Sequence, residues 1–123
     1  MIDKEIILAK ASAVAKHLRR LQEKAEIDLP MFLRDTDSQD VALFNIQMAV
    51  QNCIDIAAHI ISESGLGVPA SYNEMFYTLE ENGYFDKTLT EKMVKSVSFR
   101  NLIVHEYAKL DLDRVHHIIN RVS

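Results

Sequence analysis

One short segment gathers several side chains that could do acid–base chemistry. Within residues 100–107 stand an arginine, an amide, a histidine and a tyrosine: Arg100, Asn101, His105 and Tyr107. Side chains of these types can bind a substrate and can donate or accept protons. Their density here is typical of a catalytic segment. Taken singly, three of them also have an ordinary structural interpretation. Arg100 could be a surface ion-pair partner, His105 a partly buried polar group and Tyr107 a packed ring.

The spacing of these residues constrains how they could act together. On a helix of about 100° per residue, Asn101 and His105 lie within about 40° of each other, whereas Arg100 lies about 140° from His105. One straight helix therefore cannot aim Arg100, His105 and Tyr107 at the same atom. Either the helix bends or ends near His105, or two subunits each supply part of the site across a two-fold axis.

Other catalytic constellations are missing from the sequence. There is no glycine-rich phosphate loop, no GxSxG elbow and no HExxH motif, so P-loop hydrolases, serine hydrolases and zincins lack their parts. Two pairs have metal-like i, i+4 spacing, Asp55 with His59 and Asp113 with His117. Two ligands do not complete a metal site, and we predict neither a metal nor a cofactor.

The elements that must position the segment are predicted to be helices of one domain, residues 1–123. The chain has 123 residues, of which 48% are apolar and 26% charged, enough for one core. Three glycines and two prolines are too few to form the many turns of a β or α/β fold. The composition therefore predicts an all-α, up-and-down bundle of about five helices.

The helix boundaries follow from apolar spacing and capping residues. The first helix is predicted over residues 3–27, ended by Asp28–Pro30. Three capping boxes, at Thr36–Gln39, Ser71–Glu74 and Thr88–Glu91, predict further helix starts, with ends near Ser64 and Gly83 for the first two. Asp111 is predicted to cap a last short helix. The inward residues of the last two helices are predicted to be Leu89, Met93, Val97, Val104, Leu112, Val115, Ile118, Ile119 and Val122.

The second long helix is apolar on more than one side. One face holds Leu43, Val50, Ile54, Ala57 and Ile61, and the adjacent face holds Ala42, Ala49, Cys53, Ile56 and Ile60. Such a helix is either central to a bundle or covered by another subunit. Its remaining stripe is polar, with Asn45, Asn52, Asp55, His59 and Ser62, and faces either a narrow cleft or solvent.

Charge and cysteine content limit the environment and the partners. The formal net charge is −4, so contact with nucleic acid must be local. Residues 87–109 hold five basic against two acidic residues, while residues 71–86 hold four acidic residues and no basic one. The single Cys53 and the absence of a signal peptide or a membrane-length apolar run indicate a cytoplasmic protein with no membrane partner.

The order Arg, four residues, His, one residue, Tyr over 100–107 resembles the HEPN superfamily, in particular its HepT-like toxins. The segment Cys53–Ile61 and the stretch around Ser71 and Tyr72 share in this resemblance, which spans about Phe32 to Ile119. The resemblance implies a helical homodimer and a metal-independent endoribonuclease toxin. It also implies a cognate minimal nucleotidyltransferase antitoxin as the partner.

The resemblance assigns a role to each residue of the segment. Arg100 and His105 would be the catalytic pair in a dimer groove, and Asn101 and Tyr107 would be supporting, RNA-binding residues. Tyr107 would also be the residue modified by AMP transfer, which silences the toxin. RNA carries its own nucleophile, the 2′-hydroxyl, so cleavage needs a base, an acid and a cation near the phosphate. Histidine and arginine supply these functions without a metal.

One residue departs from the resemblance. Glu106 stands where many relatives have glycine, and an acid there would lie beside the bound phosphate. An alternative is therefore a non-catalytic helical module that binds a nucleotide or docks a nucleotidyltransferase. A purely structural interaction protein is a third possibility.

Overall fold

The chain folds into an up-and-down bundle of helices. A computed structural model describes residues 2–122, with the side chains of residues 2–120, and every regular element in that part is helical. In chain order these are α1 (Lys4–Lys24), α2 (Leu29–Arg34), α3 (Thr36–Glu63), α4 (Tyr72–Glu81), α5 (Lys87–His105), the 3₁₀ turn η1 (Tyr107–Lys109) and α6 (Leu112–Val122). The predicted all-α bundle is confirmed.

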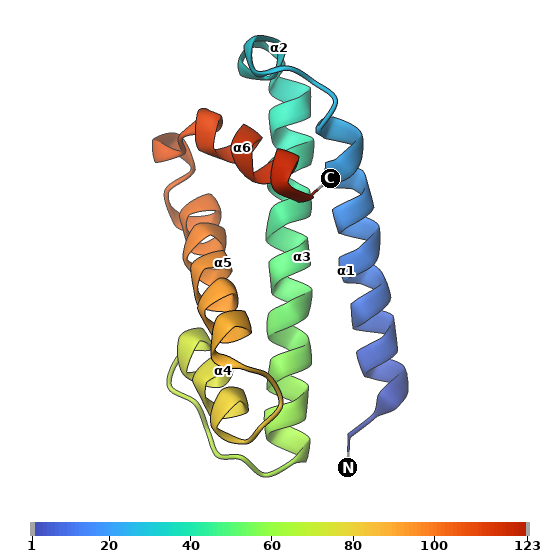
Figure 1. Ribbon diagram of the computed structural model, residues 1–123, viewed down its shortest axis with the longest axis vertical. Coiled ribbons are helices and arrows are strands. Elements are labelled where there is room, and N and C mark those ends of the chain that lie inside the picture. The colour runs from blue at the N-terminus through green and yellow to red at the C-terminus, as the bar shows by residue number, and fades with distance from the viewer. Residues whose placement is uncertain (1, 123) are drawn as a thin grey trace.

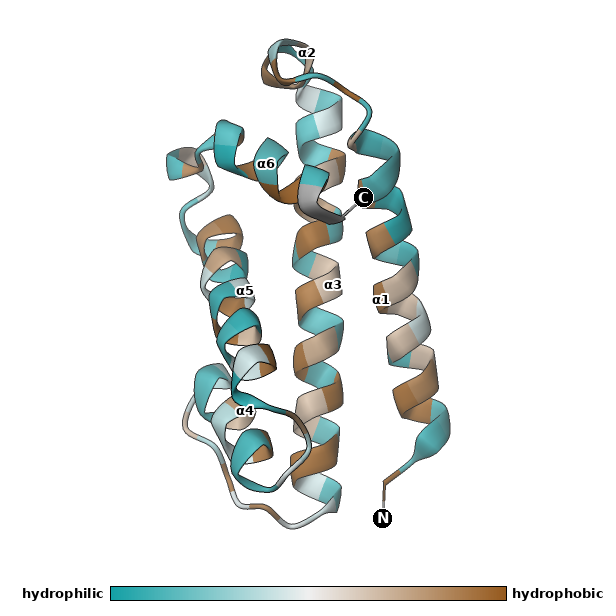
Figure 2. Cartoon of the chain, viewed as in Figure 1, coloured by the Kyte–Doolittle hydropathy of each residue, from teal (hydrophilic) through white to brown (hydrophobic). Residues whose placement is uncertain are grey.

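Helix α3 is the central element of the bundle. It runs antiparallel to α1 on one side and to α5 on the other, while α6 crosses its N-terminal half (Figure 1). Figure 2 shows apolar residues along α3 beyond its polar first turn, whereas α1 turns polar toward its C-terminal end. The predicted face that runs from Leu43 to Ile61 is buried within one chain, whereas on the adjacent face Ala42 and Ala49 are buried and the other three residues are half-buried.

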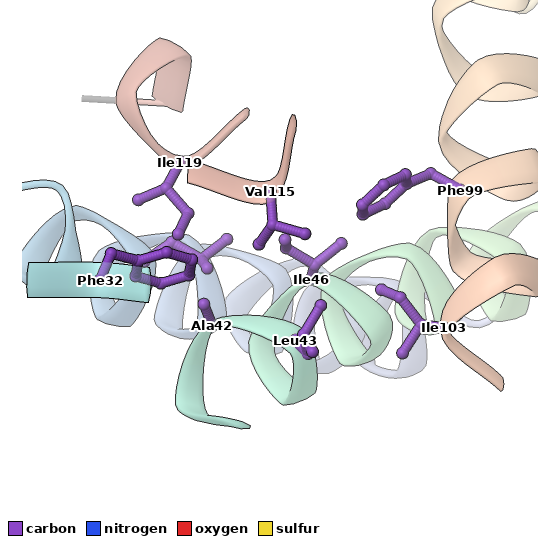
Figure 3. Packing of buried hydrophobic residues seen from close by; sticks show 9 residues of the cluster. Phe32, Ala42, Leu43, Ile46, Phe99, Ile103, Val115 and Ile119 are labelled. Atoms are coloured by element: carbon purple, nitrogen blue, oxygen red, sulfur yellow. The ribbon is translucent and has the colours of Figure 1, made fainter. Parts of the chain in front are cut away.

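Two clusters of apolar side chains make up the core. One joins α1, α2, α3, α5 and α6 around residues such as Phe32, Leu43, Phe99 and Ile119 (Figure 3). The other joins the C-terminal half of α3 to α4 and α5 through Ile54, Ala57, Ile61, Phe76, Leu79 and Val97, among others. Helix α5 contributes to both clusters, so its orientation is held along its length.

The helix starts differ in detail from the predicted capping boxes. Ser71 caps α4 by accepting from the Glu74 amide, and Asp111 accepts from the amides of Asp113 and Arg114, as predicted. For α3 and α5 the caps are not Thr36 and Thr88. The preceding carboxylates cap instead, with Asp35 accepting from the Ser38 amide and Asp86 from the Leu89 amide.

A short helix, α2, occupies the region predicted to be a break. Asp28 caps it by accepting from the Met31 amide, and Pro30 lies in its first turn. Proline is tolerated there because the first amides of a helix have no intrahelical partner. The prediction that Asp28–Pro30 only ends the first helix was therefore incomplete.

The predicted inward residues divide into three groups. Val97, Val115 and Ile119 are buried, and Met93, Leu112 and Ile118 are partly buried. Leu89 and Val104 were predicted wrongly, since they are 42% and 40% exposed. Val104 instead lines a pocket described below. Val122 lies outside the described side chains.

Helix α3 also has the length and composition of a membrane span. It is the one such helix in the described part of the chain, and half of its most apolar window is buried inside the bundle. A core helix of a soluble bundle passes the same test. Its apolar length is explained by packing on α1, α4, α5 and α6.

Candidate active site

A pocket of about 580 Å³ opens beside the C-terminal half of α5. Arg100, Asn101 and His105 line it, opposite the Ser71–Asn73 start of α4. Three of the four residues singled out in the sequence therefore share one pocket of a single chain. Residues 71 and 72, which also contributed to the family resemblance, form its other wall.

The guanidinium of Arg100 is held by side chains from three helices. Its Nη2 donates to Oε1 of Gln51 on α3 at 2.7 Å, and its Nη1 donates to Oδ1 of Asn101 at 3.1 Å. The Tyr72 ring of α4 lies 5.7 Å from the guanidinium carbon, within range of a cation–π contact. The Arg100 Nε is buried and has no hydrogen-bond partner among the described residues.

Gln51 connects this arginine to the far side of the bundle. Its amide Nε2 donates to Oδ1 of Asp55 at 3.0 Å, and Oδ2 of Asp55 accepts from Lys10 Nζ of α1 at 3.0 Å. Because Oε1 of Gln51 is the acceptor for Arg100, its amide orientation satisfies both neighbours. We call the series Lys10, Asp55, Gln51 and Arg100 the relay.

His105 is the last residue of α5 and is exposed. Glu106 follows with φ −138° and ψ 43°, outside the helical region, so the chain turns away at this point. Of the two alternatives that the spacing left open, a helix end near His105 is present within one chain. Arg100 and His105 point to different sides of α5, but the pocket spans both sides, and both residues line it.

Tyr107 lies elsewhere. It stands in η1, 53% exposed, and its hydroxyl donates to Oδ1 of Asp40 on α3 at 2.7 Å. This hydrogen bond is the main reason that the pKa of Tyr107 is raised above its usual value, and desolvation and the Asp40 charge add to it. Tyr107 does not line the pocket that Arg100, Asn101 and His105 share.

Glu106 is also absent from the pocket lining. It is exposed, and its carboxylate lies 3.9 Å from Nζ of Lys109, in the following turn. The expectation that Glu106 lies beside a bound phosphate stays a prediction, and so does the alternative of a non-catalytic module that rested on it.

The polar stripe of α3 faces neither a cleft nor solvent for most of its length. It is the contact surface for α1: the His17 ring donates from Nδ1 to Oδ1 of Asn45 at 2.7 Å, and Nε2 of His59 accepts from the Asp3 amide at 2.9 Å. Asn52 donates to the Met48 carbonyl of its own helix, and only Ser62 is exposed. We call this α1–α3 contact the polar seam; Asp55 belongs to both the seam and the relay.

The two pairs with metal-like spacing have other surroundings. Asp55 bonds Lys10 and Gln51, and His59 accepts a backbone hydrogen bond. Asp113 and His117 are exposed on α6. In the described part of the chain, no three or more His, Cys, Asp or Glu side chains gather as metal ligands would.

Sequence reasoning missed two partners of the site, Gln51 and Asp40. Both lie on α3, 49 residues before Arg100 and 67 residues before Tyr107. Neither belongs to a recognisable motif. Their only sequence signal is a polar residue within a largely apolar helix.

Comparison with known proteins identifies the family. The family described as Ribonuclease HepT-like matches residues 14–122, which is most of the chain. The chain belongs to the HepT-like ribonuclease family. The predicted resemblance to the HepT-like proteins of the HEPN superfamily is thereby confirmed, and with it the ribonuclease class.

Two relatives of known activity cover nearly the whole chain. The mRNA nuclease HepT of Shewanella oneidensis is 34% identical over 115 residues, covering 94% of this chain and 86% of the relative. The tRNA nuclease HepT of Aphanizomenon flos-aquae is 27% identical over 114 residues, covering 93% and 78%. The named RNA targets differ between these two proteins.

Solved structures agree with this assignment. A toxin–antitoxin crystal structure with AMP-PNP has a chain with TM-score 0.87 and 32% identity, covering 96% of this chain and 89% of that one. A structure of the tri-AMPylated Shewanella oneidensis HEPN toxin with MNT antitoxin has TM-score 0.84 and 34% identity, covering 93% and 85%. Both neighbours thus come from toxin–antitoxin complexes.

Proposed function

We propose that this chain is a metal-independent endoribonuclease toxin whose catalytic pair is Arg100 and His105. The observation that supports this most directly is that Arg100, Asn101 and His105 line one open pocket. The remaining lining adds an aromatic ring and small polar groups, which suit a nucleotide. Membership in a ribonuclease family supplies the reaction class.

In the proposed mechanism, His105 handles the proton and Arg100 handles the charge. His105 takes the proton of the RNA 2′-hydroxyl, which attacks the adjacent phosphorus and leaves a 2′,3′-cyclic phosphate. Arg100 binds the phosphate oxygens as negative charge develops on them. Asn101 and Gln51 hold the guanidinium in place, so little reorganisation is needed during the reaction.

A homodimer completes this proposal. The pocket is open and His105 is exposed, so a second copy across a two-fold axis could bring a second His105 to the same groove. One histidine would then act as base and the other as acid for the leaving 5′-oxygen.

We further propose that residues 1–123 form one HEPN-like domain and that this domain acts in the cytoplasm.

Control is proposed to come from a cognate minimal nucleotidyltransferase antitoxin. A similar toxin is described as tri-AMPylated and in complex with such an antitoxin. In this chain the proposed acceptor is the hydroxyl of Tyr107, a residue of η1 that is 53% exposed. The added phosphates and bases would repel and obstruct RNA near His105, two residues away.

The nuclease proposal is tested by cleavage of RNA in excess EDTA. Arg100→Ala and His105→Ala should each reduce cleavage by about 10² to 10⁴-fold, the usual contribution of such groups. Arg19→Ala and His117→Ala, which remove the same side-chain types from exposed positions of α1 and α6, are the matched controls. Cleavage that survives both site substitutions, or stops with EDTA, would refute the proposal.

The control proposal is tested by mass spectrometry of the intact protein. With a cognate minimal nucleotidyltransferase, ATP and Mg²⁺, the mass should rise by whole AMP units and RNA cleavage should fall. Tyr107→Phe should gain no AMP, while Tyr77→Phe, at an exposed tyrosine of α4, should behave as the unaltered chain. AMP on another residue would contradict the assignment to Tyr107.

A further inference from the structure

The hydroxyl of Tyr107 has a single close acceptor among the described side chains, the carboxylate of Asp40. The two oxygens are 2.7 Å apart, although the residues are 67 positions apart in the chain. Asp40 lies in the second turn of α3 and is itself exposed. The pair is therefore open to an approaching partner, and the carboxylate already lies where the hydroxyl proton points.

From this geometry we infer that Asp40 is the general base for nucleotidyl transfer to Tyr107. In the transfer, the Tyr107 oxygen forms a bond to the α-phosphorus of a nucleoside triphosphate, and the bond from that phosphorus to the bridging oxygen breaks. Pyrophosphate leaves, and the hydroxyl proton passes to Asp40. The inference rests on the proposed function and adds a catalytic residue supplied by the chain being modified.

The ionisation of the phenol favours this assignment. The Asp40 hydrogen bond raises the pKa of Tyr107 above its usual value near 10, so the hydroxyl stays protonated at neutral pH. The proton must then leave during the attack. An aspartate that accepts the proton of an attacking hydroxyl is the arrangement that protein kinases use for phosphoryl transfer.

Other ionisable groups nearby are less suited to take this proton. The carboxylate of Glu106 lies 3.9 Å from Nζ of Lys109. His105 lines the pocket on the other side of the chain turn. On α1, His17 uses its Nδ1 to bond Asn45, and Lys16 and Arg20 are cations.

Those cations give Asp40 a second favourable feature. Lys16, His17 and Arg20 line a pocket of about 380 Å³ that Asp40 also lines, together with the exposed ring of Phe44. A carboxylate alone would repel a triphosphate. Two cations in the same pocket offset that repulsion, since opposite charges near a surface attract the phosphates.

The test compares variants of Asp40 in transfer of the first AMP, followed by intact mass with excess nucleotidyltransferase, ATP and Mg²⁺. Asp40→Asn keeps an oxygen that can accept from the Tyr107 hydroxyl but cannot take its proton. It should slow transfer by at least about 10²-fold, whereas Asp40→Glu should recover part of the rate. Asp37→Asn removes a carboxylate from the same helix, one turn earlier, and should leave the rate within about twofold.

The pH profile separates a base from a residue that only positions the tyrosine. Between pH 6.5 and 9 the unaltered chain should show a nearly constant rate. The Asp40→Asn rate should instead rise about tenfold per pH unit, because only the phenolate then attacks. Lys16, His17, Arg20, His105, Glu106 and Lys109 are the same in both proteins, so their titration cancels in the comparison.

The outcomes are distinct. If Asp40→Asn transfers AMP to Tyr107 as fast as the unaltered chain at every pH, Asp40 only anchors η1 and the inference fails, while the proposed control stands. If the unaltered chain accepts no AMP at Tyr107, both fail. Melting temperature and co-elution with the nucleotidyltransferase, measured for each variant, identify a loss caused by misfolding, and Asp40→Glu then decides the inference.

Discussion

The polar seam and the pocket beside α5 contain similar side chains but use them differently. Both hold histidine, amide and charged groups on helices. In the seam, His17, Asn45 and His59 bond partners on α1 or α3, and Asn45 is only 2% exposed. In the pocket, His105 is exposed and the Arg100 Nε has no hydrogen-bond partner among the described residues.

This difference shows that residue type alone does not identify a site. Buried polar groups that bond one another within the chain stabilise it, and they have no capacity left for a ligand. Polar groups that remain exposed in a concave region can bind one. The relay joins the two regions. Substitutions along it can therefore show which residues affect the free energy of unfolding and which affect the rate of RNA cleavage.

The largest expected effect is on catalysis in the pocket. Arg100→Lys keeps the charge but loses the planar fork that reaches both Gln51 and a phosphate, so cleavage should fall by about 10² to 10³-fold. Initial rates on RNA measure this. Lys10→Arg, a charge-conserving change at the other end of the relay, is the control and should leave the rate unchanged. A rate above one tenth of normal for Arg100→Lys would argue against a catalytic arginine.

The next effect is on stability in the seam. Asn45→Ala removes the acceptor of His17 and the side-chain donor to the Val41 carbonyl, which leaves Nδ1 of the half-buried His17 ring without its acceptor. The free energy of unfolding should fall by about 1 to 3 kcal/mol, measured by urea denaturation. Cleavage per folded molecule should not change. Asn101→Ala is the matched change in the pocket. We expect it to lower the rate of RNA cleavage and to leave the free energy of unfolding nearly unchanged.

A smaller effect is expected at Gln51, which belongs to the relay. Gln51→Met keeps the length of the side chain but removes the acceptor of Arg100, and kcat should fall by about tenfold with little change in KM. Gln51→Glu restores an acceptor and should recover part of kcat. Equal losses in both variants would show that Gln51 does not position the arginine through this bond.

The smallest effect is expected at the outer end of the relay. Lys10 and Asp55 form an ion pair whose side chains are 39% and 36% exposed, and such pairs contribute about 0 to 1 kcal/mol. Lys10→Met should therefore lower the free energy of unfolding by no more than this and change cleavage by less than about twofold. Glu5→Gln, another exposed charge of α1, serves as control. A kcat loss equal to that of Gln51→Met would extend the catalytic unit to α1.

Much of the fold was predictable because it depends on local patterns. Apolar spacing and capping residues located α1, α3, α4, α5 and α6, since both signals are written within a few adjacent residues. The errors came where two signals competed. Asp35 and Asp86 stand one and two residues before the hydroxyl residues Thr36 and Thr88 and cap in their place. Pro30 was compatible with the start of a helix as well as with the end of one.

The candidate site was predictable in its motif but not in its surroundings. Arg100, Asn101 and His105 are close in sequence, so their common pocket follows from one helix. Gln51 and Asp40 could not be identified, because their roles depend on how α3 packs against α5 and η1. The orientation of Tyr107 likewise depends on the turn at Glu106, for which residues 100–107 hold no distinctive signal.

Helix α3 carries its contacts in a strict order along one continuous stretch of backbone: Asp40 for Tyr107, Asn45 for His17, Gln51 for Arg100 and Asp55 for Lys10. Each added residue in a helix rotates everything beyond it by about 100° and shifts it by about 1.5 Å. A single insertion between Asp40 and Asn45 would thus keep the first contact and misdirect all the later ones. The loop at residues 65–70 carries none of these four contacts, whereas an insertion within this part of α3 would lose the alignment of every partner beyond it.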